Sequence, residues 1–220
     1  MGAGPSVSLV LASASPARRA TLRAAGIEPV VSVSGVDEEA LAQRLLAADP
    51  PPGAAELVLA LARAKAEDVA HRLHGGSGFV LGCDSMLEVD GALVGKPGTA
   101  EVAAARWRRM RGRVGRLHTG HWLVDLRESG AAVAGLGGTS TAVVHFADLT
   151  EEEIDAYVAT GEPLQVAGGF TVDGLGGPYV SAIEGDCHGV VGVSLPLVRE
   201  LLARRGVPIH QLWRRPPGLS

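Results

Sequence analysis

The stretch SLVLASASP, residues 8–16, decides the fold class that this sequence indicates. It opens with a short apolar run, residues 8–12, whose length and flanks predict a buried strand. Ser15 suits the N-cap of a helix and Pro16 suits the first helical position, so a helix is predicted to follow directly. Residues 29–33 then resume as extended chain. A strand, a loop, a helix and a second extended segment in this order indicate an α/β fold.

The rest of the chain continues to alternate predicted strands and helices. The apolar run over residues 79–84 is predicted as a buried strand that ends on the carboxylate of Asp84. Asp90-Gly91 predicts a hairpin, because a two-residue type I′ turn requires positive φ at both central positions. Thr150 and Glu153 form a capping box at a helix start. Further helices are predicted over residues 54–73, 99–110 and 196–205, and strands over residues 117–126, 139–147 and 179–184.

The composition of the 220-residue chain, with 46% hydrophobic and 20% charged residues, is typical of a globular α/β enzyme. Its length allows one large domain or two closely joined lobes. A formal net charge of -4 gives no general attraction to nucleic acid or to an anionic membrane. Any phosphate must therefore be recognised by a local group of residues.

Cys83 and Cys187, the two cysteines, match neither a metal-ligand spacing nor a disulfide framework. The N-terminal residues lack the basic region and long apolar run of a signal peptide, and no stretch reaches the length that spans a membrane. We therefore expect a soluble, cytoplasmic protein with no membrane partner and no stable nucleic-acid partner.

A first group of polar residues lies at the predicted strand-to-helix turn, where Ser13, Ser15 and Arg18 cluster. Free backbone N–H groups and the positive end of a helix dipole form an anion site there, which hydroxyls and a guanidinium would complete. An arginine in the first turn of a helix opposes the macrodipole, so its presence hints at a negative ligand in front of it. Ordinary capping with solvated arginines is the alternative.

A second group joins Asp84 to Lys96 through the predicted hairpin. A two-residue turn at Asp90-Gly91 makes Ser85 face Lys96, so Asp84 and Lys96 meet at the open end. A lysine can then reach a phosphate held beside the carboxylate, whose oxygen suits a hard divalent cation such as Mg2+ or Mn2+. A plain cross-strand ion pair is the alternative.

Three further features have a functional and a structural interpretation. The acidic residues Asp37-Glu38-Glu39 could supply another metal ligand or lie in a solvated loop. Lys65 lies on an alanine-rich helix, where a lysine would usually extend its charge to water. Six arginines between Arg106 and Arg116 could form a nucleic-acid groove, but a single aromatic residue there favours a solvated helix face. The glycine-rich residues 167–177 allow close approach of backbone to a ligand, or a set of tight turns.

Several short blocks occur in an order that resembles the Maf family of nucleotide pyrophosphatases, in particular its actinobacterial-type members. The likeness covers nearly the whole chain, and its specificity comes from the order of blocks that are individually weak. They are LASASPAR (residues 11–18), GCD (82–84), GKP (95–97), GEP (161–163), AGGF (167–170), EGD (184–186), VVG (190–192) and LPL (195–197).

The resemblance implies a Maf/ITPase-like α/β architecture, in which helices flank an elongated mixed β-sheet. It also implies a single domain over residues 1–220, whose two closely joined lobes enclose a central cleft. It implies that a nucleoside triphosphate is cut between its α and β phosphates, with a divalent metal cation (Mg2+, Mn2+ or Co2+) and as a homodimer. A nucleotide-binding regulator of cell division with incidental hydrolysis is the alternative. The matching positions are Asp84, Lys65 and Lys96 as catalytic residues, Ser13, Ser15, Arg18 and Asp173 for substrate, and Asp84 with Glu38 for metal.

Three positions depart from the pattern of many family members. Many members have a second arginine at the position of Ala17, a lysine at that of Val166 and a glutamine at that of Asp173. Those residues mark a branch that resembles dTTP and UTP pyrophosphatases. Another branch, similar to 7-methyl-GTP pyrophosphatases, lacks the lysine and has an acidic residue at the position of Asp173. A carboxylate accepts hydrogen bonds from a guanine-like edge, so Asp173 favours a modified purine.

Overall fold

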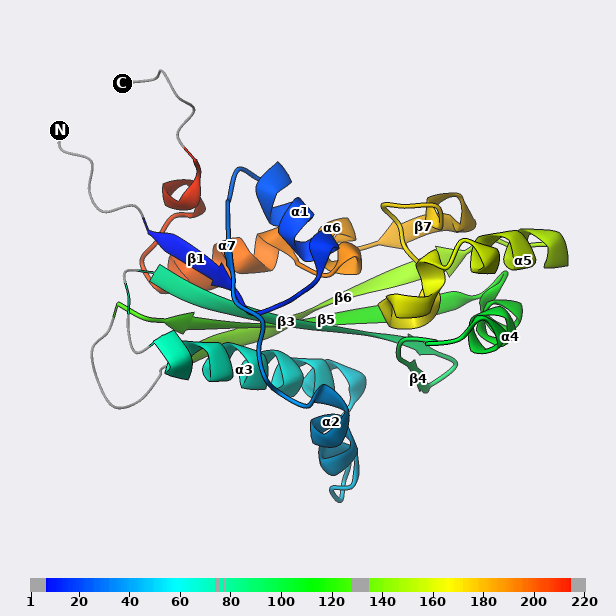
Figure 1. Cartoon of the computed structure of the whole chain (residues 1–220), viewed down its shortest axis with the longest axis horizontal. Helices are drawn as coiled ribbons and strands as arrows, with labels where there is room; N and C mark the ends of the chain where they lie inside the picture. Colours follow the sequence, from blue (N-terminus) through cyan, green and yellow to red (C-terminus); the bar gives the residue numbers. More distant parts are fainter. Residues whose placement is uncertain (1–6, 74–75, 77, 128–134, 215–220) are drawn as a thin grey trace.

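A mixed β-sheet of seven strands runs through the molecule (Figure 1). The structure is a computed structural model that describes residues 7–73, 76, 78–127 and 135–214. The strand order is β2-β1-β3-β5-β6-β7, and β4 is an additional strand that pairs with β3. Strand β1 pairs in parallel with β2 and β3, and the other pairs are antiparallel. The strands are β1 (Ser8–Leu11), β2 (Val30–Val31), β3 (Gly78–Val89), β4 (Ala92–Val94), β5 (Val114–Asp125), β6 (Gly135–Phe146) and β7 (Val180–Glu184).

Helices cover both faces of this sheet (Figure 1). The long α3 lies on one face, α1, α6 and α7 lie on the other, and α4 and α5 pack at the far end. The helices are α1 (Pro16–Ala24), α2 (Glu38–Leu46), α3 (Ala54–Leu73), α4 (Ala100–Met110), α5 (Glu151–Ala159), α6 (Cys187–Val191) and α7 (Leu195–Arg204), with 3-10 turns η1 (Glu162–Gln165), η2 (Ala167–Gly169), η3 (Gly177–Tyr179) and η4 (Ile209–Leu212). No helix in the described residues combines the length and apolar composition that a membrane span requires.

The alternation of side chains along β1 explains why its buried residues, 9–11, and Ala12 after it are all apolar. Leu9 and Leu11 pack with α1 and α7, whereas Val10 and Ala12 pack with α3 on the opposite face. A strand that is covered on both faces needs apolar residues at every position, because successive side chains point to opposite sides. The sequence therefore identified the strand by its continuous apolar run.

A separate apolar cluster forms at the other end of the sheet, around Trp107 of α4. The indole is fully buried and makes edge-to-face contacts with Phe146, Tyr157 and Tyr179. Such contacts contribute beyond the area that the rings bury. This cluster fixes α4 and α5 on the same end of β5 and β6.

One edge of β3 carries two strands with a gap between them. Strand β1 pairs with β3 up to Leu81, β4 pairs with it from Leu87, and β5 occupies the whole opposite edge. Residues 82–86 therefore have a neighbouring strand on one side only. Backbone groups on the open side must find other partners, because an unpaired buried group is costly.

Most of the expected elements are confirmed, and the differences concern β3, residues 37–39 and α6. The helix start at Ser15 and Pro16, the Thr150–Glu153 capping box and the turn at Asp90-Gly91 are present. The expectation that the strand ends at Asp84 was wrong, because pairing with β5 carries β3 on to Val89. The acidic residues 37–39 do not form a loop, since Asp37 caps α2. Helix α6 was not expected.

Helix α3 lies unusually close to the sheet because two strand positions beneath it are glycines. A Cβ added to Gly82 would lie 2.1 Å from the carbonyl oxygen of Ala62, and one added to Gly120 would lie 2.3 Å from that of Val58. Both obstacles are backbone atoms of α3, so a larger residue would push the helix away from the sheet. The two glycines thus set the distance between α3 and the middle of β3.

We expect the substitution Gly82→Ala to lower the free energy of unfolding by about 3 kcal/mol or more, because the added methyl group overpacks against the α3 backbone. Gly35→Ala is the matched control, since a Cβ at Gly35 meets nothing within 4 Å. Its effect should stay within about 0.5 kcal/mol. Urea unfolding of both variants provides the measurement, and equal stabilities would contradict the close packing of α3.

Candidate active site

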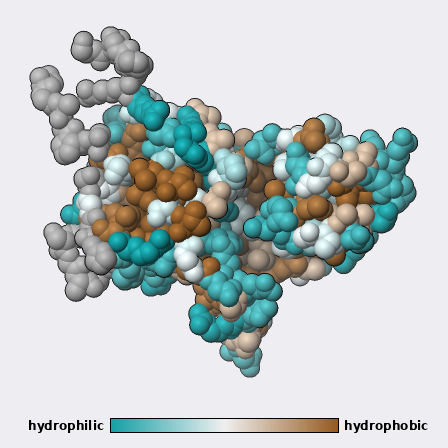
Figure 2. Space-filling view, viewed as in Figure 1, coloured by the Kyte–Doolittle hydropathy of each residue, from teal (hydrophilic) through white to brown (hydrophobic). Residues whose placement is uncertain are grey.

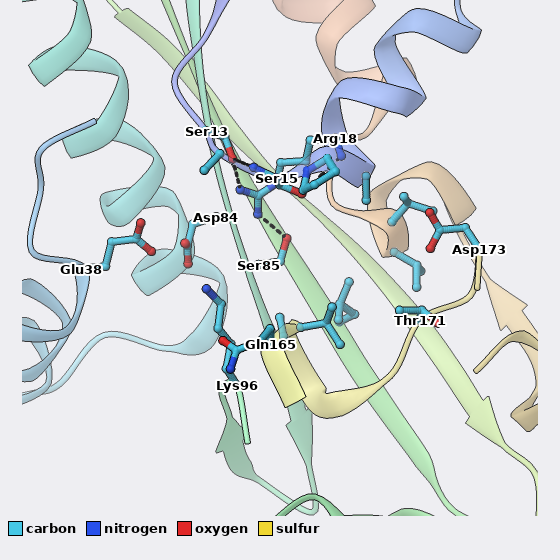
Figure 3. Close-up of a pocket in the computed structure, with 18 of the residues that line it drawn as sticks. Ser13, Ser15, Arg18, Glu38, Asp84, Ser85, Lys96, Gln165, Thr171 and Asp173 are labelled. Carbon is cyan, nitrogen blue, oxygen red and sulfur yellow. Dashed lines mark hydrogen bonds between the residues drawn. The ribbon is translucent and has the colours of Figure 1, made fainter. Parts of the chain in front are cut away.

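A pocket of about 400 Å³ lies over the gap in the edge of β3. Figure 2 shows the surface hollowed between the two ends of the molecule, and Figure 3 shows the residues that line the pocket. The lining includes all eight residues to which the sequence gave a role in the site, namely Ser13, Ser15, Arg18, Glu38, Lys65, Asp84, Lys96 and Asp173. They come from the start of α1, from α2, α3 and β3, and from the segments after β4 and η2.

The start of α1 is built around Ser13, Ser15 and Arg18. The Ser15 hydroxyl accepts a hydrogen bond from the Arg18 backbone N–H at 3.4 Å, which caps the helix, and the Ser15 N–H donates to Ser13 Oγ at 3.2 Å. The Arg18 guanidinium also donates to Ser13 Oγ, at 3.0 Å. Capping is therefore present, but Arg18 is not the solvated arginine of the alternative interpretation.

The Arg18 guanidinium reaches across the open edge of β3. It donates to the Cys83 carbonyl oxygen at 2.9 Å, to Ser85 Oγ at 3.1 Å and to the Gly192 carbonyl oxygen at 2.9 Å. The first of these bonds satisfies a backbone acceptor in the stretch that has no partner strand on that side. Arg18 thereby joins α1, β3 and the end of α6 at the pocket.

Lys65 is buried, with 4% of its surface exposed, between two carboxylates. Its Nζ lies 2.7 Å from Asp84 Oδ1 and 2.8 Å from Glu38 Oε2. The structural interpretation, in which Lys65 extends its charge to water, was wrong, because the close approach of α3 to β3 places the side chain directly beside Asp84. The catalytic role that the family resemblance implies stays a prediction. The acidic patch contributes one pocket residue through Glu38 of α2.

Asp84 is itself buried, at 8% exposure. Its removal from water disfavours the ionised form and raises the pKa of the carboxyl, while the charges of Lys65 and Arg18 offset part of this effect. The group is therefore a carboxylate with an increased tendency to take up a proton.

Lys96 lies on the same side of the pocket as Asp84 and Glu38 (Figure 3). The hairpin register holds only as far as Leu87 and Val94, where β4 ends, so Ser85 and Lys96 are not a strand pair. In the described residues Asp84 forms its ion pair with Lys65 and none with Lys96. The plain cross-strand ion pair of the alternative interpretation is thus absent from the part of the chain that the structure covers.

The opposite wall of the pocket carries Thr171 and Asp173, with Gln165 nearer to Lys96 (Figure 3). Four polar residues of the lining, Ser34, Ser85, Gln165 and Thr171, had no site role in the sequence analysis. Ser85 directly follows Asp84 in a strand, so its side chain points to the opposite face of the sheet. Side-chain alternation along the strand could therefore have predicted the direction of Ser85 from that of Asp84. Gln165 and Thr171 reach the pocket through tertiary folding, and their local sequence gave no such signal.

Asp84 and Glu38 are the two pocket residues whose chemistry fits a divalent cation. Both offer carboxylate oxygens, which Mg2+ and Mn2+ prefer, and these ions commonly take only one or two protein carboxylates and complete their shell with water and phosphate oxygens. The Lys65 ammonium lies between the two carboxylates. Another group, Asp186, Cys187 and His188, brings three ligand atoms within 4.8 Å of one another but does not line the pocket.

Four of the six arginines between Arg106 and Arg116 have partners within the protein. Arg108 and Arg111 contact Glu151 at 2.7 and 2.8 Å, and Arg113 pairs with Asp90 at 2.5 Å. Arg106 donates to the carbonyl oxygen of Gly95. These contacts connect α4 to α5 and to the hairpin.

Comparison with known proteins shows the family to which the chain belongs. A family model described as "Maf-like protein" matches residues 8–205. The chain belongs to the Maf family. A protein of Nocardia farcinica (strain IFM 10152) is 57% identical over 210 residues, which cover 94% of this chain and 97% of the relative. A protein of Saccharopolyspora erythraea is 54% identical over 210 residues, covering 94% and 97%. Each of these two relatives is named nucleoside triphosphate pyrophosphatase.

The three positions that depart from many Maf sequences share one location. Ala17, Val166 and Asp173 come from three distant parts of the chain, and all three line the same pocket. The departures therefore change the pocket wall and not a remote surface.

A buried histidine supports the turn between α6 and α7, next to this wall. His121 Nε2 accepts from the Ser194 N–H at 2.8 Å, and its Nδ1 donates to the Thr119 carbonyl oxygen at 3.0 Å, so the ring must be neutral. Burial, assisted by the positive charge of Arg18, lowers the pKa of His121 to about 4.

We expect His121 to make folding sensitive to acid. Its pKa is about 4 in the folded state and about 6.5 when unfolded, so the unfolded state binds more protons between these values and stability falls as the pH decreases. The full effect is about 3 kcal/mol. Between pH 6.5 and 4, the free energy of unfolding of His121→Gln, measured with urea, should therefore fall less than that of the native chain. His210 is exposed, so the free energy of unfolding of His210→Gln should fall as much as that of the native chain. An unchanged pH slope in His121→Gln would contradict this role.

Proposed function

We propose that this Maf protein hydrolyses nucleoside triphosphates between the α and β phosphates, releasing a nucleoside monophosphate and pyrophosphate. The relatives' names support the proposal. The observation that carries it is the convergence of three cationic side chains, Arg18, Lys65 and Lys96, on one pocket around a buried carboxylate, Asp84. A triphosphate carries several negative charges, and such a pocket neutralises them locally in a protein whose net charge is negative.

Each residue has a distinct part in the proposed reaction. The Ser13 and Ser15 hydroxyls at the start of α1 donate to phosphate oxygens, next to the positive end of the helix dipole, and Arg18 and Lys96 offset the charge that develops when the anhydride breaks. Asp84 removes a proton from the attacking water, a task that its raised pKa favours because a more basic carboxylate is a better proton acceptor. Lys65 holds Asp84 in place through the 2.7 Å ion pair.

We also propose that Asp84 and Glu38 hold a divalent cation, Mg2+, Mn2+ or Co2+, together with the substrate. Such an ion would supply positive charge next to the phosphate oxygens. The support is the oxygen chemistry of the two carboxylates and their common position at Lys65. The homodimer and the cytoplasmic location expected from the sequence are proposed with the activity.

For the nucleobase, we propose a preference other than dTTP or UTP. Ala17 and Val166 remove two cationic side chains from the pocket wall, and Asp173 adds an acceptor. A carboxylate accepts hydrogen bonds from the N–H groups on a guanine-like edge, which supports a modified purine nucleotide.

The proposed activity is tested by incubating the protein with canonical and modified nucleoside triphosphates and with Mg2+, Mn2+ or Co2+. We expect pyrophosphate, and not inorganic phosphate, as the released product. Tight nucleotide binding without turnover across the panel would instead support the alternative, a regulator of cell division. Turnover of dTTP and UTP in preference to all purine nucleotides would overturn the proposed base preference.

Replacing Asp84 tests the assigned chemistry. We expect Asp84→Asn to lower kcat by about 100-fold or more, because an amide cannot accept the proton of the attacking water. Asp155→Asn is the matched control, since Asp155 is an exposed residue of α5 that lies outside the pocket. The measurement is the rate of pyrophosphate release from the best substrate. Full activity in Asp84→Asn would show that this carboxylate is neither the proton acceptor nor an essential ligand.

A further inference from the structure

Glu162, the first residue of η1, accepts four hydrogen bonds with one carboxylate. The Tyr157 hydroxyl donates to Oε1 at 3.1 Å, and the Gly176 N–H donates to the same oxygen at 3.0 Å. The Thr171 hydroxyl donates to Oε1 as well, and the Leu175 N–H donates to Oε2 at 3.0 Å. Glu162 does not line the pocket, so these contacts are not made by a residue placed to touch substrate.

Three of the four donors, Thr171, Leu175 and Gly176, come from the two ends of a single loop, residues 171–176, and the fourth, Tyr157, comes from α5. Backbone passes so close that a Cβ at Gly174 would lie 2.6 Å from Glu162 Oε2, and one at Gly176 would lie 2.4 Å from the Tyr157 hydroxyl. Glycine at these two positions is therefore a condition for the contact. The loop is shaped around Glu162 and the Tyr157 hydroxyl.

The same loop forms one wall of the pocket. Thr171, Val172 and Asp173 line it, while Gln165 at the end of η1 lines the neighbouring wall. Glu162 begins η1 and binds the loop, so one side chain fixes both walls relative to each other. Burial alone would raise the pKa of Glu162, but hydrogen bonds from Thr171 and from the backbone of Leu175 and Gly176 outweigh it and lower the pKa.

We propose that Glu162 is a positioning residue, which holds the loop of residues 171–176 and thereby sets, through Asp173, which nucleobase the pocket accepts. The inference rests on the proposed hydrolysis of nucleoside triphosphates. The phosphates are held at the opposite side of the pocket, by α1, α3 and β3. A change at Glu162 therefore alters base selection and substrate binding more than the chemical step.

The substitution Glu162→Gln separates this role from bulk and shape. A glutamine has nearly the same size but only one acceptor oxygen, and its NH2 group is a donor. If the oxygen stays with Gly176, the NH2 group faces the N–H of Leu175; if the amide is reversed, it faces the N–H of Gly176. Hydroxyl donors can rotate away, but backbone N–H groups cannot, so one of the two N–H groups loses its bond to residue 162 in either orientation. The Gly176 N–H then keeps its 3.3 Å bond to Thr171 Oγ1, whereas Glu162 is the acceptor that the Leu175 N–H would lose.

Kinetics across a panel of nucleoside triphosphates tests the effect on selectivity. In Glu162→Gln we expect the ratio of kcat/KM between the best and the next-best nucleobase to fall at least fivefold. The fall should come from changes in KM, and kcat for the best substrate should change less than threefold. Tyr157→Phe, which removes one hydroxyl donor, should change the ratio in the same direction by less. Glu151→Gln is the control, because Glu151 is a carboxylate of α5 outside the pocket, and it should leave the ratio unchanged. A lower kcat for all nucleotides at an unchanged ratio would overturn the proposal.

Amide hydrogen exchange tests the positioning itself without any substrate. We expect the peptide that covers residues 171–176 to exchange at least tenfold faster in Glu162→Gln than in Glu151→Gln, with β3 and β5 unchanged in both. Unchanged exchange in the loop would overturn the positioning role, whatever the kinetics show. If the native chain hydrolyses no nucleotide while exchange in the loop rises, the proposed function and base selection fail and the positioning role stands.

Discussion

The gap in the edge of β3 is the constraint on which the rest of the site depends. Between the end of β1 and the start of β4, the strand has a neighbour on one side only. Cys83 in this stretch presents its carbonyl to the gap, where the guanidinium of Arg18 and the ammonium of Lys65 reach it at 2.9 and 3.5 Å. Completing the backbone hydrogen bonding of the sheet thus brings two cations to the place where Asp84 and Ser85 point to opposite faces.

Two layers of packing keep these charged groups where they are. On one face, Gly82 and Gly120 allow α3 to lie against the sheet, which buries Lys65 beside Asp84. On the other, apolar contacts of α1 and α7 with β1 and β3 hold the helix start that carries Arg18. A cation that is confined in this way loses little further conformational entropy when an anion binds, so the pocket is preorganised for the phosphate binding that we propose.

In the proposed function, the recognition of the nucleobase depends on a different part of the chain. The groups proposed to bind phosphate come from the first half of the sequence, whereas Thr171 and Asp173, which line the same pocket, follow η2. The loop that carries Asp173 has no strand or α-helix of its own and is shaped by contacts to Glu162. Variation in this loop can alter base choice while the phosphate site stays intact, which is consistent with departures at Ala17, Val166 and Asp173 in an otherwise typical Maf sequence.

The sequence by itself determined the α/β class, the bounds of α3, the helix start at Ser15 and the hairpin turn, because apolar periodicity, capping and turn geometry are local. The order of the Maf blocks likewise named most of the pocket residues. Only the tertiary structure decided that β3 continues through Asp84, that Lys65 is buried between two carboxylates and that Glu162 shapes the loop of Asp173. These features depend on residues far apart in the chain, where strand pairing and helix packing override the tendency of each segment taken alone.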